Sequence, residues 1–401
     1  MESDDVGTVA PQILEGRLLN PSCRVEEVTS VAQFMALRDV WRQVLDKSQQ
    51  HTPFLTYEWF QCCLAGYLGH KDLFVLVIRD GSEVLGIAPW WRYHDVVRGI
   101  PVRRLGFIMG PDTPEVDFIS QQGQRAIVLE TVLNHCFSLR KDAWDMLTLS
   151  QWPIESPHYS VLEQILQQKH QAFCKGIFSK TLYLPIQKEW EAYLQTRSLK
   201  FRKTYRNIMN RINKLNNVEI QCIRQNVTGD IWQDVLSVSK KSWKFQAEIA
   251  IASQSEAERF FEVLTDMASQ QGWLFVWLLK VDTFPIAMEY DLAYAGRVYA
   301  LRADFDESYK ELSPGSFLEY HIIKYLFEKG YCEYNLGPGL NAYKFHWTDH
   351  IRDNTFFSIY NITAKGIIMS LLERRLIPLL RHLRDIKENI IKVKFELWGG
   401  S

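Results

Sequence analysis

One pattern that occurs twice constrains the fold more than any other feature of the sequence. A segment with helical apolar spacing (57–68) precedes an apolar strand pattern (73–79), the dipeptide Asp80-Gly81 and a second strand pattern (83–90). Asp-Gly readily adopts the positive backbone angles of a tight hairpin turn. These residues therefore predict a helix followed by a β-hairpin.

The same order returns about 200 residues later. A helical pattern (255–271) precedes strand patterns at 274–280 and 285–292, a turn at Asp282-Thr283 joins them, and a third strand pattern (297–302) follows. Chance similarity of two hairpins is one explanation, but a recurring unit also indicates a duplicated domain.

The length of 401 residues favours duplication, because two domains of ordinary size fit into it. We expect an α/β (α+β) chain of two similar domains, 25–180 and 181–362, each a mixed, mainly antiparallel sheet flanked by helices. Residues 1–24 are polar and aperiodic, so a flexible leader is predicted there.

Residues 363–401 predict a basic amphipathic helical tail, in which Pro378 should kink or divide the helix. The sequence is compatible with two roles for this tail: it packs on the last domain, or it attaches to an anionic membrane surface.

The net charge of −1 gives no single-sign field, so a nucleic-acid partner is not expected. The amino terminus has no secretory pattern, and the seven cysteines include no Cys-x-x-Cys pair. These features favour a cytoplasmic protein without a metal site.

Seven basic residues and no acid lie within 197–214, and apolar residues recur there at helical spacing. This basic amphipathic helix predicts either a solvated face or a surface for an anionic ligand.

The segment from 300 to 349 holds most candidate site residues. Ser313-Pro314 is a typical helix start, and the amides of Gly315 and Ser316 would point from it toward an anion. Neither a dinucleotide fingerprint nor a phosphate-binding loop occurs in the segment. The sequence also lacks a nucleophile elbow and a zinc helix.

The segment contains Phe305-Asp306, Tyr309, Ser313-Pro314-Gly315, a strand to Gly337, Tyr343-Lys344 and Trp347. Together these residues resemble the C-terminal signature of the CelD-like acyltransferases of the GNAT superfamily, which are associated with cellulose and other exopolysaccharide synthesis. Weaker similarity extends over about 30–350 and includes Thr52-Pro53-Phe54, Gly86-Ile87-Ala88-Pro89 and Arg104-Leu105-Gly106.

The resemblance implies two tandem GNAT-like domains, with an acyl-CoA (acetyl-CoA) cleft in the second. Carried over to this sequence, Ser313, Gly315 and Ser316 would face the pyrophosphate, Lys344 would contact a phosphate or carboxylate, and Tyr343 would line the cleft as a catalytic candidate. The usual GNAT pyrophosphate loop, Gln/Arg-x-x-Gly-x-Gly/Ala, is absent from this segment, which leaves the acyl donor open.

A general base should be a carboxylate or histidine beside the cleft. Asp304 is the first choice because it ends a predicted strand, and Glu289 and His346 are the alternatives. Arg302 is a candidate partner for an acidic group or a phosphate.

The working hypothesis is an acyltransferase that modifies an amine or hydroxyl of a sugar or envelope precursor, with a membrane or a polysaccharide synthase as further partners at the inner membrane face. One alternative is a Fem-type transferase, which uses aminoacyl-tRNA. Another is a non-catalytic polysaccharide-binding module that uses Trp90, Trp91, Trp144 and Trp152.

Overall fold

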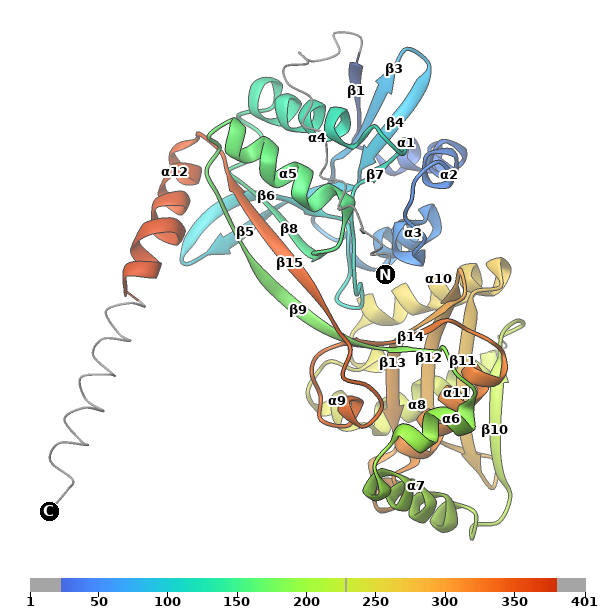
Figure 1. Cartoon of the computed structure of the whole chain (residues 1–401). Helices are drawn as coiled ribbons and strands as arrows, with labels where there is room; N and C mark the ends of the chain where they lie inside the picture. The colour runs from blue at the N-terminus through green and yellow to red at the C-terminus, as the bar shows by residue number, and fades with distance from the viewer. Residues whose placement is uncertain (1–22, 228, 381–401) are drawn as a thin grey trace, which may run out of the picture.

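A computed structural model describes residues 23–227 and 229–380, and Figure 1 displays their arrangement. Two domains lie side by side, joined by two long strands that run through both. The expected leader lies outside the described residues except for Cys23 and Arg24, which begin the first strand. The tail beyond residue 380 also lies outside them.

The first domain contains eight of the strands that the structure describes. They are β1 (Cys23–Val28), β2 (Asp72–Leu73), β3 (Val75–Asp80), β4 (Glu83–Ala88), β5 (Trp90–Val97), β6 (Ile100–Phe107), β7 (Ile119–Ser120) and β8 (Met146–Pro153). Its helices are α1 (Val31–Met35), α2 (Arg38–Asp46), α3 (Tyr57–Tyr67), α4 (Arg125–Asn134) and α5 (Pro157–Gln168).

The second domain has the same kinds of elements. Its strands are β10 (Val218–Ile223), β11 (Leu274–Val281), β12 (Phe284–Tyr294), β13 (Arg297–Phe305) and β14 (Glu333–Pro338). Its helices are α6 (Trp190–Thr196), α7 (Leu199–Ile212), α8 (Gly229–Lys241), α9 (Trp243–Gln246), α10 (Ser255–Gln271) and α11 (Pro314–Glu328).

Both domains contain, in this order, a first strand, helices, an antiparallel hairpin, a further strand, a helix and then a strand parallel to that further strand. The first domain also has the additional strands β2, β5 and β7. The parallel pairs are β6 with β8 and β13 with β14. Both predicted hairpins are present, and in the second the turn residues Asp282 and Thr283 have φ of 47° and 72°. The expected fold class, two tandem domains with mixed, mainly antiparallel sheets, is confirmed.

The two domains share the strands β9 (Phe173–Pro185) and β15 (Ile351–Tyr360). β9 pairs with β14 of the second domain, and β15 lies between β9 and β8 of the first domain. The result is one eleven-stranded sheet that crosses both domains, beside a separate four-stranded sheet of β1, β3, β4 and β7. The sequence-based domain boundary between 180 and 181 falls inside β9.

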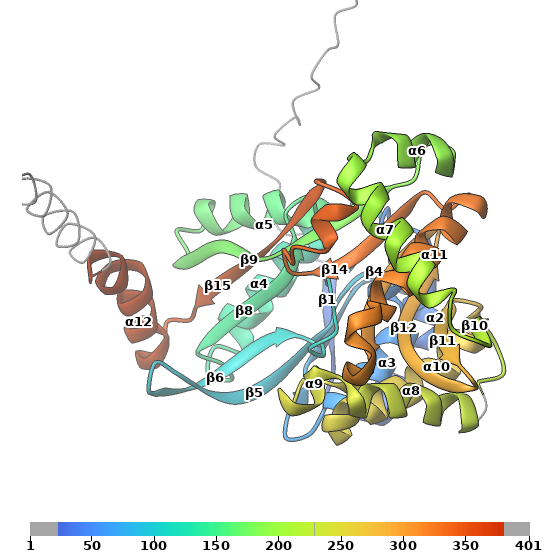
Figure 2. The same ribbon diagram turned by 90° about the horizontal axis from the view of Figure 1, so that it is seen from below.

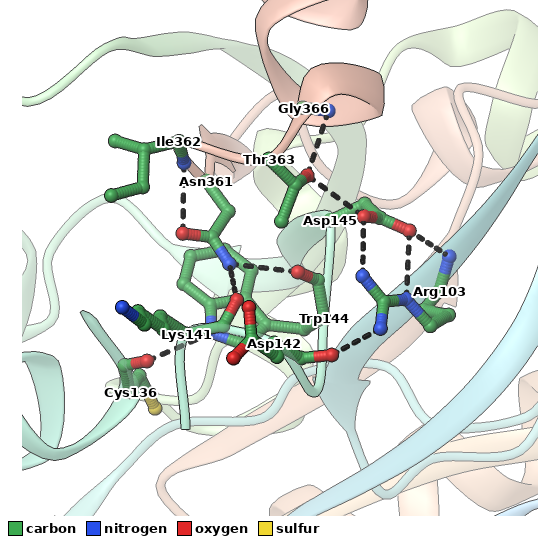
Figure 3. Close-up of polar contacts among 10 residues, drawn as sticks. All are labelled: Arg103, Cys136, Lys141, Asp142, Trp144, Asp145, Asn361, Ile362, Thr363 and Gly366. Carbon is green, nitrogen blue, oxygen red and sulfur yellow. Dashed lines mark hydrogen bonds and ion pairs between the residues drawn. The ribbon is translucent and has the colours of Figure 1, made fainter. Parts of the chain in front are cut away.

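The segment after β15 is fixed to the first domain by a polar cluster around Asp145 (Figure 3). The Asp145 carboxylate accepts hydrogen bonds from the Arg103 side chain at 2.8 and 3.0 Å and from the Thr363 hydroxyl at 2.8 Å. The amide nitrogen of the Asn361 side chain donates to the carbonyls of Lys141 and Trp144 at 2.6 and 2.7 Å. These contacts hold β15 in place at its C-terminal end.

Helices α3 and α10 make a close contact between the domains. A Cβ atom added at Gly66 would lie 2.7 Å from the backbone oxygen of Glu256, so only glycine allows the two helices to approach this far. The rings of Trp59 and Phe260 meet edge to face across the same contact, 5.2 Å apart. This packing joins the cores of the two domains into one apolar cluster.

Alternating residues of the second-domain strands pack on opposite layers of helices (Figure 2). Tyr290 and Leu292 face the cluster that contains α10, whereas Phe275 and Trp277 face a second cluster formed with α6, α7 and α11. Because α11 follows β13 and precedes β14, its first turn lies beside the point where these two strands separate.

The chain continues after β15 as α12 (Ala364–Leu371), followed by a π-helical turn (Leu372–Leu376). Pro378 lies just beyond this turn, where a proline removes one backbone donor from the helix. Among the described helices, none is long and apolar enough to cross a membrane.

Candidate active site

A cavity opens where β13 and β14 stop pairing. Their parallel ladder extends only from Arg297 to Tyr299 on one strand and from Glu333 to Asn335 on the other. Beyond it lies a cavity of about 420 Å³, within the range of small-molecule sites. It is lined by residues of β12, β13, β14, α11 and the loop after β14, and by Ser242, Trp243 and Lys244.

Glu289 of β12 lies in the wall of this cavity and is buried. Its carboxylate accepts a hydrogen bond from the hydroxyl of Tyr334 on β14. Burial raises the pKa of Glu289 to about 7, although the Tyr334 hydrogen bond and the positive charges of Lys244 and Lys344 oppose the rise. A carboxyl group with this pKa can take up and release a proton near neutral pH.

Two further buried carboxyl groups surround Glu289. Asp291 follows it on the same face of β12, and burial together with the charge of Glu289 raises its pKa well above the ordinary value. Glu319 of α11 lines the cavity, and burial and the same neighbouring charge raise its pKa to about 8. Three carboxylates this close would repel one another, so the cluster holds protons at neutral pH.

Lys344 is buried at the opposite wall of the cavity, after β14. Its ammonium donates hydrogen bonds to the carbonyls of Gly337 and Pro338, both at 2.8 Å, which leaves one N–H for another acceptor. Burial lowers the pKa of Lys344 to about 8, with Glu319 opposing the change. The side chain thus supports the loop after β14 and still faces the cavity.

Asp304 lines the cavity, but its carboxylate already has partners. The Ser242 hydroxyl donates to it at 2.9 Å, and the Lys244 ammonium lies 3.2 Å away. These partners hold the Asp304 carboxylate, whereas Glu289 is buried in the cavity wall with a raised pKa, so the arrangement favours Glu289 as the base.

Arg302 also lines the cavity, and its guanidinium forms an ion pair with Asp112 of the first domain at 2.7 Å. It donates a further hydrogen bond to the carbonyl of Ile249 at 2.8 Å. These contacts occupy much of its hydrogen-bonding capacity. Its role in this structure is to join the cavity wall to the first domain.

The start of α11 differs from the expected cap. Ser313 adopts a left-handed conformation with φ of 57° and makes no side-chain capping bond, and its hydroxyl lies 3.4 Å from Arg211 of α7. Gly315 and Ser316 line the cavity, whereas Ser313 does not. The first-turn amides of α11, which have no acceptor within the helix, lie at the cavity edge.

The last two predicted residues lie in different places. Tyr343 lines the cavity and is 44% exposed, so it can reach a ligand. His346 lies in a separate depression of about 460 Å³ beside the start of α7, together with Arg197 and Lys200. His346 therefore does not line the same cavity as Glu289.

The comparisons with known proteins support this placement. Residues 200–345 match a family model described as an acetyltransferase (GNAT) domain. The match covers most of the second domain, and we refer to this matched segment as the GNAT domain. Every residue that lines the cavity lies inside the match, so the cavity is part of the GNAT domain. The match does not identify the CelD-like subfamily. No curated protein matches the sequence.

The whole fold is similar to several solved structures. The crystal structure of FemX matches with a TM-score of 0.56 at 12% identity, over 84% of this chain and 98% of that one. A conserved protein of unknown function from Bacteroides thetaiotaomicron gives 0.52 at 13% identity, over 84% and 100% of the two chains. L-PGS from Bacillus licheniformis gives 0.50 at 12%, over 84% and 96%. At these identities the similarity concerns the fold.

Four residues of the GNAT domain were not predicted from sequence: Asp291, Glu319, Tyr334 and Lys244. Asp291 had a usable signal, because Glu289 and Asp291 alternate inside an apolar strand pattern. Glu319 interrupts the apolar face of α11 in a similar way. Tyr334 and Lys244 had no such signal, because their positions depend on contacts between distant segments.

The basic helix forms as predicted, and Phe201, Tyr205, Ile208 and Ile212 are its buried residues. The remaining face of α7 carries Lys200, Lys203 and Arg211, and Lys214 follows just after the helix. We group these four residues as the unpaired cations of α7, because none of them forms an ion pair with a described residue. Among the described residues there is also no group of three or more side chains suited to hold a metal ion.

Proposed function

We propose that this protein transfers an acyl group from acyl-CoA to an amine or hydroxyl of a sugar or of an envelope or exopolysaccharide precursor. The observation that carries the proposal is the separation of β13 and β14 above the buried carboxyl group of Glu289. The match of this segment to a GNAT acetyltransferase domain supports a transferase reaction.

Acyl-CoA would supply an activated thioester, and the residues of the chain would provide position and proton transfer. Glu289 would accept the proton that the acceptor amine or hydroxyl loses as it attacks the thioester carbonyl. The carbon–sulfur bond of the thioester would then break, and CoA would leave as the thiolate or, after protonation, the thiol. The Tyr334 hydroxyl orients Glu289, and the single remaining N–H of Lys344 can donate to an anionic oxygen.

The start of α11 would bind the phosphate-bearing part of the donor through the amides of Gly315 and Ser316. Arg211 and the unpaired cations of α7 extend this positive region next to Ser313. This arrangement would replace the pyrophosphate loop that the sequence lacks.

Titration of the purified protein with CoA and acetyl-CoA tests the donor directly. Glu289→Gln should retain CoA binding and lose transfer, with Glu219→Gln on exposed β10 as the matched control. Absence of CoA binding to the folded protein would exclude the proposal.

Aminoacyl-tRNA is the other donor to test. The fold similarity to FemX does not carry over its substrates, and α7 is followed closely by β10 without a long helical arm. A non-catalytic polysaccharide-binding role is weaker, because Trp90, Trp91, Trp144 and Trp152 are all buried. Transfer assays with both donors decide between these functions.

A further inference from the structure

One end of the first domain carries a surface that the proposed reaction does not use. Helix α12 and the tip of the β5–β6 hairpin lie together at the end away from the second domain in Figures 1 and 2. Met369 of α12 is fully buried among Val102, Met146 and Tyr360, with Val97 and Ile100 of the hairpin packed against the same cluster.

The outer side of this unit is apolar. We define the α12 surface as the exposed apolar residues Val96, Ile362, Ile367, Ile368, Leu371, Leu376, Leu379 and Leu380. Val96 and Ile362 are 65% and 66% exposed, although they belong to a hairpin and to the segment before the helix. Single exposed apolar residues are common, whereas a continuous group on adjacent elements marks an interaction site.

The charges next to the α12 surface are mainly positive. Lys365, Arg374 and Arg375 are exposed, and none forms an ion pair with a described residue. The acid in this helical segment, Glu373, accepts a hydrogen bond from the Tyr360 hydroxyl at 2.5 Å and lies 3.6 Å from Arg98. The free charges that face outward are therefore cations.

We propose that the α12 surface binds to the headgroup region of an anionic lipid bilayer. Apolar side chains beside unpaired Lys and Arg are the combination that holds an interfacial helix on such a membrane. A second copy of the chain fits less well, because a symmetric dimer would bring Arg374 and Arg375 toward the same cations of its partner. This inference does not depend on acyl transfer.

The anchored segment is also firmly connected to the fold. Thr363 and Asn361, which precede α12, hold the polar cluster around Asp145. A Cβ atom at Gly366 would lie 2.3 Å from the Asn361 carbonyl oxygen, so α12 sits directly on this cluster. Binding at the α12 surface would thus fix the orientation of the first domain on the membrane.

Sedimentation with lipid vesicles tests the proposal, using the full chain. The protein should bind vesicles that contain phosphatidylglycerol and bind poorly to vesicles of phosphatidylcholine alone. Arg374→Glu with Arg375→Glu should weaken binding by at least about thirtyfold, because two attractive charges are lost and two repulsive charges are added. Leu371→Asp with Leu376→Asp should weaken it by at least about tenfold, because apolar burial is lost.

Two matched controls use α7. Leu199→Asp alters another exposed leucine, and Lys203→Glu with Lys214→Glu makes the same change in net charge as the arginine variant. Both controls should bind vesicles like the original protein. If the α7 charge variant loses binding and the α12 variants keep it, the assignment to α12 is wrong.

Size-exclusion chromatography with light scattering distinguishes the second-copy alternative. Two results together would overturn the proposal. The original protein would be a dimer that the substitutions Leu371→Asp with Leu376→Asp dissociate, and it would not bind anionic vesicles. CoA binding measured on the two α12 variants should be unchanged. Failure of membrane binding is thereby separated from failure of the proposed function.

Discussion

Arg302 of β13 and Asp112 of the first domain form an ion pair of 2.7 Å across the boundary between the domains. Only 15% and 6% of their side-chain surfaces are exposed. Arg302 also lines the cavity of the GNAT domain, so the pair links the geometry of the candidate active site to the position of the first domain.

Replacement of one partner should destabilise the protein, because the other charge would remain buried without a partner. Arg302→Met should lower the free energy of unfolding by about 3 kcal/mol. The double variant Arg302→Met with Asp112→Asn should recover much of this loss in urea denaturation. Arg259→Met, which breaks an exposed pair with Glu262, is the control and should change stability by less than about 1 kcal/mol. If the double variant is no more stable than Arg302→Met, the buried unpaired charge is not the cause of the loss.

The pH dependence of catalysis should report on Glu289. The base must be deprotonated, so kcat/KM should rise with pH and level off above about 7, the pKa that burial gives Glu289. Tyr334→Phe removes a hydrogen bond that lowers this pKa, so the rise should move to higher pH. Glu289→Gln should reduce kcat by about a hundredfold or more. An unchanged profile in Tyr334→Phe would point to another base.

Glu319 should make stability depend on pH in the opposite sense from an ordinary ion-paired acid. Its pKa rises from 4.5 to about 8 on folding, so the folded state favours the protonated form. The contribution of Glu319 to the free energy of unfolding is complete below pH 4.5. It is lost as the pH rises to about 8, at up to about 1.4 kcal/mol per pH unit. The Glu319→Gln variant should therefore gain stability over the original protein across this window, as measured by denaturation at several pH values. A constant difference would contradict the buried ionisation.

Asp145 should stabilise the fold more at neutral pH than at acidic pH, as an ordinary ion-paired acid does. Burial opposes its ionisation, but hydrogen bonds from Arg103 and Thr363 outweigh that effect and lower its pKa from 3.8 to about 2. Its stabilising effect is present above pH 3.8 and is lost as the pH falls through about 2. Asp145→Ala should cost about 3 kcal/mol at neutral pH. Asp142→Ala, at a neighbouring exposed acid, should cost much less.

Gly66 should tolerate no side chain. Gly66→Ala places a Cβ 2.7 Å from the Glu256 carbonyl oxygen and 2.7 Å from Cβ of Phe260, so α3 and α10 would have to move apart. A loss of about 1–3 kcal/mol in the free energy of unfolding is expected. Gly229→Ala, where no atom lies within 4 Å of the added Cβ, is the control. Equal stability of the two variants would mean that the helices can separate without cost.

The sequence predicted the elements whose signals are local. Alternating apolar residues and turn dipeptides identified both hairpins, and helical spacing identified α10 with the same bounds that the structure has, 255–271. The same reasoning could not predict that β15 pairs with β8, because that contact joins segments about 200 residues apart and has no local signature.

The candidate site was predictable to a similar degree. Seven of the nine predicted site residues line the cavity, but their relative roles were not predicted. The sequence does not reveal the partners of Asp304 and Arg302. In the folded chain Ser242 and Lys244 contact Asp304, and Asp112 pairs with Arg302. Glu289 differs because it is buried beside two other carboxyl groups, Asp291 and Glu319, and its hydroxyl donor, Tyr334, lies on β14.

The pairing of β15 with the first-domain sheet has a consequence for folding during synthesis. The first-domain sheet needs β15, which the ribosome synthesises after almost all of the second domain. Until residue 360 has emerged, β8 presents an unpaired edge to other chains. The usual order, in which an N-terminal domain completes its folding before the next one is made, is therefore not open to this chain.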